Sequence, residues 1–201
     1  MARTGGELLG TSEAVIQFLS SDLPGGSAET RSIAAADVDG DGDLDVLLGT
    51  LGSPSRVLLN AGDGTFPTSI ELPGGSAPTA SIAAADMDGD GDLDVLLGNT
   101  GSPSRVLLNA GDGTFPTSIT LPGGSAPTVS IAAADVDGDG DLNVLLGSYG
   151  SPSRVLLIAG GGTFPTSIEL PGGSASTSSV VADRKSTRLN SSHSGLSRWQ
   201  M

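Results

Sequence analysis

Residues 33–72 read IAAADVDGDGDLDVLLGTLGSPSRVLLNAGDGTFPTSIEL, and this stretch contains the pattern that decides the fold. Four short runs, at 32–36, 44–49, 56–61 and 65–72, are rich in strand-forming residues and are bounded by turn residues. The pair Asp63-Gly64 is a typical tight-hairpin signal between the third and fourth runs. No window sustains a helical periodicity, so the stretch predicts four antiparallel strands.

The same pattern returns at 82–121 and 131–170, with a strict period of 49 residues. The first two copies differ at 4 of 40 positions, and the third differs from the first at 5. Four strands in a repeat of this length are typical of a propeller blade. We therefore predict an all-β fold, an incomplete β-propeller of about three four-stranded antiparallel blades plus partial blades at both ends. A parallel β-helix is the alternative architecture, but its repeats are far shorter.

The period also divides the chain into units. A remnant of a preceding repeat, three complete repeats and the start of a truncated fourth are predicted at 1–22, 23–72, 73–121, 122–170 and 171–182, respectively. A three-bladed arc leaves apolar sheet faces uncovered. We therefore expect the isolated chain to be marginally stable, and to dimerise or aggregate unless missing blades from a parent chain are restored.

The C-terminal tail breaks the repeat pattern. Residues 183–193, DRKSTRLNSSH, resemble the translation of a common sequencing adapter. We interpret 183–201 as a non-biological tail and exclude it from the fold prediction. A genuine basic disordered tail is the alternative.

An acidic loop separates the first two predicted strands of each repeat, and in the first repeat it reads Asp37-Val-Asp39-Gly-Asp41-Gly-Asp43-Leu-Asp45. Carboxylates at positions 1, 3, 5 and 9 with a glycine at position 6 can surround one hard cation, and position 7 can add a backbone carbonyl. Without a cation, two carboxylates ~5 Å apart repel by about 3 kcal/mol at an effective dielectric constant of 20. Oxygen-only donors favour Ca²⁺ over Zn²⁺ or copper, and Mg²⁺ prefers a stricter octahedron. A solvated acidic turn without metal is the alternative.

The loop shares these features with the EF-hand, but the EF-hand also needs a bidentate Glu at position 12. That position is Leu48, Leu97 or Leu146 here, inside a predicted strand. No helices are predicted on either side of the loop, so the EF-hand interpretation fails.

The acidic loop is followed in each repeat by a second motif, which in the first repeat is Val57-Leu-Leu-Asn60-Ala-Gly-Asp63-Gly-Thr-Phe66. Together the two motifs resemble the FG-GAP / VCBS-type calcium-binding repeat, related to the integrin alpha-like β-propeller blades, over about residues 23–182. The resemblance implies about three Ca²⁺ ions, one per loop, bound by side-chain oxygens at positions 1, 3, 5 and 9 and by the main-chain oxygen at position 7. The implied ligands are Asp37, Asp39, Asp41, Asp43 and Asp45; Asp86, Asp88, Asp90, Asp92 and Asp94; and Asp135, Asp137, Asp139, Asp141 and Asn143. Because Asn143 keeps an oxygen but lacks a charge, we predict that the third site is the weakest.

Other repeated residues are interpreted as structural. We expect the phenylalanines Phe66, Phe115 and Phe164 to fill the space between neighbouring sheets. The arginines Arg56, Arg105 and Arg154 are expected to lie on a solvated edge or to pair with nearby carboxylates, although a ligand-binding row is the alternative. Tyr149 looks exposed.

The net charge of -14 comes from the acidic loops, because 14 of the 23 acidic residues lie there and the other nine are matched by nine bases. This acidity argues against nucleic acid or an anionic membrane as a partner. No apolar run is long enough for a membrane-spanning helix, so no membrane insertion is expected. The absence of cysteine excludes disulfides and thiolate metal sites.

The residues available for chemistry argue against an enzyme. The only His and the only Lys, His193 and Lys185, lie in the suspect tail, so no base is available to activate a serine or threonine. We expect a module of a larger extracellular protein that acts in adhesion or binds a protein or glycan ligand. The alternatives are a non-catalytic propeller domain appended to a secreted enzyme and a pure structural spacer array. Weak calcium sites would fill at a cell surface, outside the cell or in a periplasm, although no signal peptide is visible.

Overall fold

The computed structural model describes residues 23, 28–159, 163–182 and 189–193. These residues form β-strands joined by turns and loops, with no helix among them. The first repeat contains β1 (Glu29–Ala36), β2 (Asp45–Leu51), β3 (Arg56–Leu59) and β4 (Thr68–Glu71). The second contains β5 (Thr79–Ala85), β6 (Asp94–Asn99), β7 (Arg105–Leu108) and β8 (Thr117–Thr120), and the third contains β9 (Thr128–Ala134), β10 (Asn143–Ser148), β11 (Arg154–Leu157) and β12 (Thr166–Glu169). The strands β13 (Thr177–Ala182) and β14 (Leu189–His193) follow.

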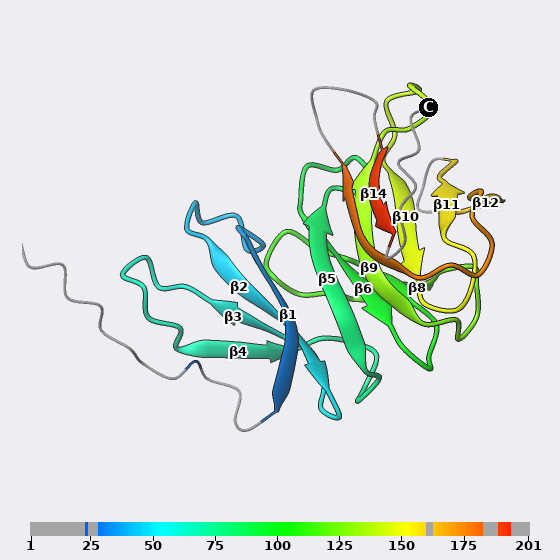
Figure 1. Ribbon diagram of the computed structural model, residues 1–201. Helices are drawn as coiled ribbons and strands as arrows, with labels where there is room; N and C mark the ends of the chain where they lie inside the picture. Colours follow the sequence, from blue (N-terminus) through cyan, green and yellow to red (C-terminus); the bar gives the residue numbers. More distant parts are fainter. Residues whose placement is uncertain (1–22, 24–27, 160–162, 183–188, 194–201) are drawn as a thin grey trace, which may run out of the picture.

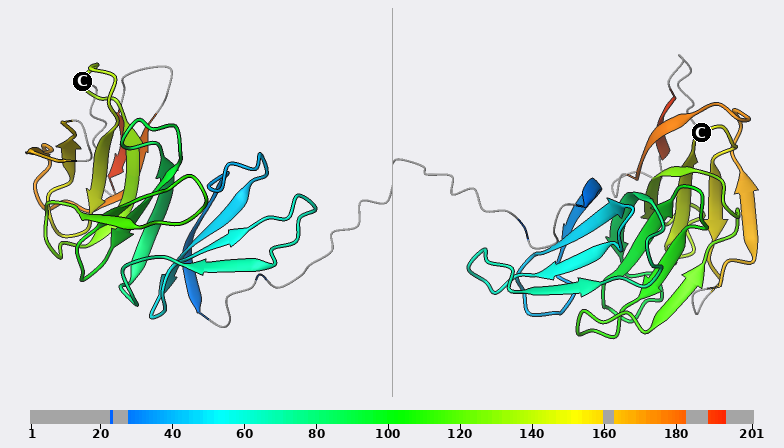
Figure 2. Two further views of the ribbon diagram at one scale, coloured as in Figure 1. Left: turned by 180° about the vertical axis from the view of Figure 1, so that it is seen from behind. Right: turned by 90° about the horizontal axis from the view of Figure 1, so that it is seen from below.

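Each repeat forms one four-stranded antiparallel sheet whose strands pair in chain order, and β13 pairs with β14 in a fourth, two-stranded sheet. The first strand of each sheet packs against the first two strands of the preceding sheet, so the sheets follow one another along an open arc (Figures 1 and 2). The predicted all-β incomplete propeller with three four-stranded blades is confirmed.

The second strand of each blade is an almost continuous apolar run because a neighbouring sheet can cover each of its faces. In β6, Val95 and Leu97 belong to the apolar cluster between the first and second sheets, whereas Leu96 belongs to the cluster between the second and third. This division follows from the alternation of side chains along a strand. All six residues of β6 are buried.

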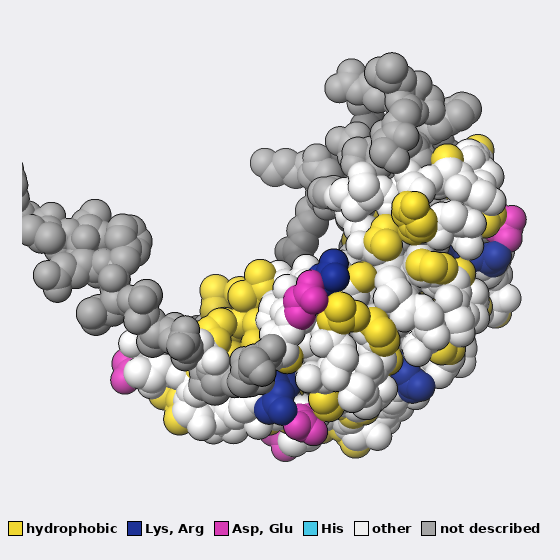
Figure 3. Space-filling view, turned by 60° about the horizontal axis from the view of Figure 1, so that its bottom comes forward, with side chains coloured by type: hydrophobic (Ala, Val, Ile, Leu, Met, Phe, Trp, Pro, Cys, Tyr) yellow, Lys and Arg dark blue, Asp and Glu magenta, His cyan; other side chains and the backbone are white. Residues whose placement is uncertain are grey.

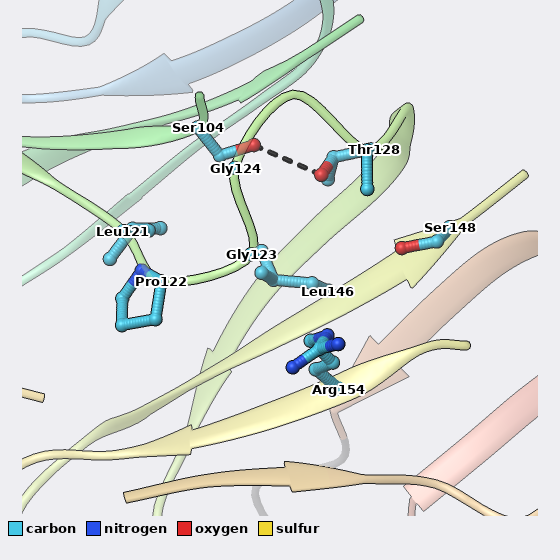
Figure 4. Close-up of a pocket in the computed structure, with 10 residues that line it drawn as sticks. Ser104, Leu121, Pro122, Gly123, Gly124, Thr128, Leu146, Ser148 and Arg154 are labelled. Atoms are coloured by element: carbon cyan, nitrogen blue, oxygen red, sulfur yellow. Dashed lines mark hydrogen bonds between the residues drawn. The ribbon is translucent and has the colours of Figure 1, made fainter. Parts of the chain in front are cut away.

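Small residues allow the sheets to approach closely. A Cβ added to Gly98 of β6 would lie 3.1 Å from Cγ2 of Thr128 on the next sheet, which explains why glycine occurs here in each repeat. The Oγ of Ser104 donates a hydrogen bond to Oγ1 of the same threonine at 3.0 Å (Figure 4). Equivalent bonds join Ser55 to Thr79 and Ser153 to Thr177.

The fourth strand of each sheet is largely exposed at its outer edge. The arginines of the neighbouring third strand lie there, and two of them pair with carboxylates, as expected. Arg56 forms an ion pair with Glu71 at 2.6 Å, and Arg154 forms one with Glu169. Within the described residues, Arg105 has no ion pair, because Thr120 occupies the matching position, and its Nη1 donates to Ser118 instead.

The predicted role of the phenylalanines is confirmed where two sheets meet. Phe115 is buried in the cluster between the first two sheets, and Phe164 packs against the cluster between the second and third. Phe66 is half-buried. Tyr149 is exposed, as expected.

The two ends of the chain are described only in part. The predicted repeat remnant at 1–22 lies outside the described residues, as do 183–188 and 194–201 of the tail. No strand was predicted after residue 182, whereas residues 189–193 form β14 and pair with β13. The strand β13 repeats the first-strand pattern of the other sheets, including a register shift near its start.

Candidate metal centres

Each acidic loop joins the first strand of a sheet to the second. In the second repeat the loop lies between β5 and β6, and two glycines give it its curvature: Gly89 has φ of 80° and Gly91 has φ of 100°. Both values lie in the left-handed region, which residues with a Cβ rarely adopt. The loop therefore turns back on itself within six residues and directs its alternate carboxylates inward.

The first aspartate of the loop holds this turn together. Oδ1 of Asp86 accepts a hydrogen bond from the backbone N–H of Gly89 at 2.8 Å, and Oδ2 accepts one from Gly91 at 3.1 Å. Asp37 and Asp135 make the same pair of bonds in the other two loops. A loop of glycines and aspartates thus has a defined shape without contributing to the apolar core.

Three carboxylates converge in every loop. One oxygen from each aspartate at positions 1, 3 and 5 lies within 4.8 Å of the other two. The triplets are Asp37, Asp39 and Asp41; Asp86, Asp88 and Asp90; and Asp135, Asp137 and Asp139. Nine of the fifteen predicted ligands are therefore brought together in three groups, one per loop, and these groups could hold metal ions.

In the first two triplets, the aspartate at position 3 is less readily ionised in the absence of a cation. The pKa of Asp88 is raised, first by burial and then by the neighbouring charge of Asp90. The pKa of Asp39 is raised in the same way, chiefly by burial, and the charges of Asp45 and Asp41 add to the effect. A bound cation would reverse this balance, because it favours the ionised form of each carboxylate.

Position 9 has a different environment from the triplet. Asp94 is fully buried; its Oδ2 accepts a hydrogen bond from the backbone N–H of Met87 at 2.8 Å, and its Oδ1 accepts one from Asn109 at 2.8 Å. Asp45 makes the equivalent bonds to Val38 and Asn60. Burial raises the pKa of Asp94 to about 6 although these two hydrogen bonds lower it. Each oxygen keeps a second lone pair, so the assignment of Asp45 and Asp94 as ligands stays a prediction.

Position 7 is compatible with the predicted use of its main-chain oxygen. A Cβ added to Gly62 would lie 2.6 Å from Oδ2 of Asp43, and one added to Gly111 would lie 2.6 Å from Oδ2 of Asp92. The side chains of Asp43 and Asp92 therefore lie against the loop between the third and fourth strands of their own sheets. Gly62 and Gly111 leave room for them there. The role of the main-chain oxygens of Asp43, Asp92 and Asp141 stays a prediction.

The third loop differs at position 9. Asn143 is fully buried, and its Nδ2 donates to Oδ1 of Asp137 at 3.3 Å and to the main-chain oxygen of Asp141 at 3.5 Å. Its Oδ1 is buried and has no hydrogen-bond partner among the residues that the structure describes. The amide donor is thus directed at a member of the acidic triplet, where the carboxylates of the other loops would face a cation as acceptors. That the third site is the weakest stays a prediction, and this orientation of the amide supports it.

The role of the asparagine in the second motif was not predicted from the sequence. The Nδ2 of Asn109 donates to the main-chain oxygens of Leu93 at 3.0 Å and of Val38, in the preceding blade, at 2.7 Å. Its backbone N–H donates to Asp94, so one residue connects the loop of its own blade with the loop of the neighbour. The signal in the sequence is the presence of Asn60 and Asn109 in the two repeats that keep an aspartate at position 9.

Comparisons with known proteins agree with this architecture. The model of the FG-GAP-like repeat matches residues 37–97 and again residues 86–146. No curated protein matches the chain. Among solved structures, BBS1N in complex with ARL6DN, soaked with lead, superimposes with a TM-score of 0.53 and 11% identity, over 84% of this chain and 48% of that one. The same complex soaked with mercury gives a TM-score of 0.54 and 12% identity, over 87% of this chain and 58% of that one.

The chain therefore spans about half the length of these structures, and at such identities the likeness shows the fold alone, which is of the propeller type. Within the described residues, no helix is long and apolar enough to cross a membrane. The two family matches together span residues 37–146, which is more than half of the chain. They include all three acidic loops. The chain belongs to the FG-GAP-like repeat family, as a repeat module of propeller type.

Proposed function

We propose that the chain binds about three Ca²⁺ ions, one in each acidic loop, and that calcium stabilises a propeller-type scaffold. The observation that carries this proposal is the convergence of three carboxylate oxygens within 4.8 Å of one another in each of the three loops. Calcium is the preferred ion because the donors are all oxygens and Mg²⁺ requires a stricter octahedral geometry. Mg²⁺ and a metal-free acidic turn are the competing interpretations.

Calcium would act on stability through the charge of the loops. Burial and neighbouring carboxylates raise the pKa values of Asp39 and Asp88, so their ionised forms are disfavoured in the folded chain without a cation. A bound divalent ion attracts the carboxylates that otherwise repel one another. The loop, which joins the first two strands of its sheet, is then stabilised in its folded shape. Since those two strands also contact the next blade, stabilisation of a loop would extend to the interface between blades.

Calorimetric titration of the full chain, first stripped with a chelator, tests the proposal directly. We expect a stoichiometry of about three with Ca²⁺, dissociation constants of about 10⁻⁴ to 10⁻³ M as in extracellular modules, and much weaker binding of Mg²⁺. The double variant Asp88→Asn, Asp90→Asn removes two triplet carboxylates of the second loop and should lower the stoichiometry by one.

A matched control separates a specific site from the general attraction of an acidic protein. Asp63→Asn, Asp112→Asn also removes two charges, but both side chains are exposed and lie outside the triplets. This variant should keep the full stoichiometry. Equal losses of binding in the two variants, or equal binding of Mg²⁺ and Ca²⁺, would contradict a specific calcium site.

We further propose that the scaffold is non-catalytic and presents a surface for adhesion or for a protein or glycan ligand, at a cell surface, outside the cell or in a periplasm. Such a location supplies the calcium that weak sites need. The similar structure BBS1N, which was crystallised in complex with ARL6DN, supports a protein partner for a fold of this kind. A non-catalytic domain appended to a secreted enzyme and a pure spacer array are the alternatives.

Binding screens on the calcium-loaded full chain distinguish these alternatives. A glycan array and a panel of purified extracellular proteins, each tested with calcium and with chelator, should reveal a ligand that binds only in calcium. Absence of binding on both panels would favour the spacer array. Hydrolysis of any glycan on the array by the purified chain would contradict the non-catalytic assignment.

A further inference from the structure

The loop between β7 and β8 of the second sheet packs against the acidic loop of the first sheet. The Nδ2 of Asn109 donates a buried hydrogen bond to the main-chain oxygen of Val38 at 2.7 Å. A Cβ added to Gly113 would lie 3.5 Å from Cβ of Asp39, which is ordinary van der Waals contact. Positions 2 and 3 of the first acidic loop are therefore in contact with the second blade.

This contact changes the exposure of residues that the repeats share. Gly113 is buried, whereas its equivalent Gly64 in the first repeat, which faces no preceding blade among the described residues, is exposed. Asp39 is half-buried, whereas Asp88, at the same position of the second loop, is exposed. The aspartate at position 3 of the first triplet is thus in contact with its own loop and with the next blade.

Asn109 also belongs to the second acidic site. Its backbone N–H donates to Oδ1 of Asp94 at 2.8 Å, and its Nδ2 donates to the main-chain oxygen of Leu93 at 3.0 Å. Its Oδ1 accepts a hydrogen bond from the backbone N–H of Gly111 at 3.1 Å, so the amide is oriented with Nδ2 toward the two carbonyls. One residue therefore holds positions 8 and 9 of the second loop and position 2 of the first.

The second and third loops are connected differently. Ile158 stands at the position equivalent to Asn109, and it lies in the same apolar cluster as Met87, which is position 2 of the second loop. An isoleucine side chain has no polar atom, so it donates no hydrogen bond to the second loop. Because apolar contacts are not directional, this contact constrains the main chain of the second loop less than a hydrogen bond would.

We propose that Asn109 couples the first two acidic loops, so that Ca²⁺ in one of them raises the affinity of the other, while the third loop fills independently. An ion in the second loop orders Leu93 and Asp94, which hold Asn109, and Asn109 in turn holds Val38. The first loop then loses less conformational freedom when it binds its own ion. The coupling is reciprocal, and the inference rests on the calcium binding proposed above.

The placement of the loops provides a matched comparison. The three acidic loops lie at the same end of their sheets, at the top of Figure 1, whereas acidic side chains are sparse on the face shown in Figure 3. The first and third loops each belong to a blade next to the second. Removal of two charges from either of them therefore changes the electrostatic field at the second loop to a similar extent, and only the Asn109 contact differs.

NMR titration of the chelator-stripped full chain with Ca²⁺ observes the second site separately, through the amide resonance of Gly91 at position 6 of its loop. Disabling the first loop with Asp39→Asn, Asp41→Asn should weaken binding at Gly91 about fivefold, at the low end of allosteric coupling. Disabling the third loop with Asp137→Asn, Asp139→Asn should change it by less than about twofold, because salt screens the lost charges.

A second pair of variants tests the residue itself. Asn109→Ala keeps the backbone N–H that donates to Asp94 but removes the side-chain bonds to the first loop. In this variant, disabling the first loop should no longer weaken binding at Gly91. Asn60→Ala makes the same truncation at a residue without contact to a preceding blade among those described, and the coupling should persist. The comparison of loops keeps Asn109 intact, so it decides the proposal even where Asn109→Ala fails to fold.

Each outcome decides the proposal. Weaker binding at Gly91 with the first loop disabled but not with the third, and only while Asn109 is present, would support it. Equal losses from the two disabled loops would overturn the coupling and leave calcium binding intact. The same loss with and without the Asn109 side chain would overturn the role of this residue. A Gly91 resonance that does not shift at about 10 mM Ca²⁺ in the unsubstituted chain would contradict the calcium site itself, and the coupling with it.

Discussion

The second and third repeats share their fold but differ in chemistry. They differ at 7 of 40 aligned positions, yet β6 and β10 have the same length, the same register with the first strand and the same fully buried pattern. The residues that differ include the partners of the acidic loop. Asp94 and Asn109 of the second repeat are replaced by Asn143 and Ile158 in the third.

These two replacements belong together. In the second repeat the carboxylate of Asp94 accepts the backbone N–H of Asn109, and the amide of Asn109 reaches the preceding blade. In the third repeat Ile158 joins the apolar cluster between the second and third sheets, and within the described part of the chain Oδ1 of Asn143 has no hydrogen-bond partner. A polar connection between blades is thus exchanged for an apolar contact, and the second and third sheets pack together although the acidic loop of the third repeat lacks the carboxylate at position 9.

We expect the largest loss of stability when Asn109 of the second repeat is replaced by isoleucine, the residue that the third repeat has at the equivalent position 158. Asn109→Ile removes two donated hydrogen bonds and leaves buried main-chain groups of Val38 and Leu93 without this donor. We expect a loss of about 1–3 kcal/mol in the free energy of unfolding, measured by urea denaturation. Asn60→Ile is the control, because Asn60 makes no contact with a preceding blade among described residues, and it should lose less. Equal losses would show that the contact between blades contributes nothing.

The reverse change in the third loop should restore a charge at position 9. Asn143→Asp replaces an amide donor that faces Asp137 by a carboxylate. We expect the affinity of the third site for Ca²⁺ to rise by about tenfold or more, since an added charge close to a divalent ion is worth at least about 1.4 kcal/mol. Calorimetric titration of the full chain measures this, with Asp94→Asn as the opposite change in the second loop. An unchanged affinity in both variants would show that position 9 is a structural residue and not a ligand.

The edge strands allow a smaller test. Thr120→Glu would give Arg105 the partner that Arg56 and Arg154 have in Glu71 and Glu169. These side chains are partly exposed, so we expect a gain of only about 0.2–1 kcal/mol, and less in high salt. Thermal unfolding of the full chain measures it, and Thr120→Gln, which adds the same length without charge, should give no salt-dependent gain. A gain that persists in high salt would exclude the ion pair as its cause.

The hairpin before the fourth strand should give the smallest effect. The hydroxyl and backbone N–H of Thr114 donate to Asp112 and hold its pKa below the ordinary value of 3.8. Because the pKa is lower in the folded state, this carboxylate stabilises the fold above about pH 4, and the contribution is lost as the pH falls through the lowered pKa. Asp112→Gly, which copies Gly161 of the third repeat, should therefore be slightly less stable at pH 7 and match the unsubstituted chain near pH 2. A difference that is independent of pH would assign the effect to the added flexibility of glycine.

The sequence by itself determined the blade. The strands and the acidic turn follow from local patterns of apolar, glycine and aspartate residues, and the structure reproduces them in each repeat. The prediction of a tight hairpin at Asp63-Gly64 is wrong in length, because β3 ends at Leu59 and β4 begins only at Thr68. The convergence of positions 1, 3 and 5 was predictable for the same reason, because alternate residues of a glycine-rich turn face the same side. Local sequence contains enough information for these features since their contacts lie within a few residues.

Only the tertiary structure decided the environments of residues that the repeats share. Ile33 and Ile82 stand in the same local sequence, yet one is exposed and the other buried, because a preceding sheet covers only the second. The hydrogen bond from Asn109 to Val38 joins residues 71 positions apart in the chain, and Asp94 accepts one of its two backbone hydrogen bonds from Asn109, 15 positions away. Burial and desolvation depend on neighbours in space, and a local pattern that occurs three times cannot encode three different neighbours.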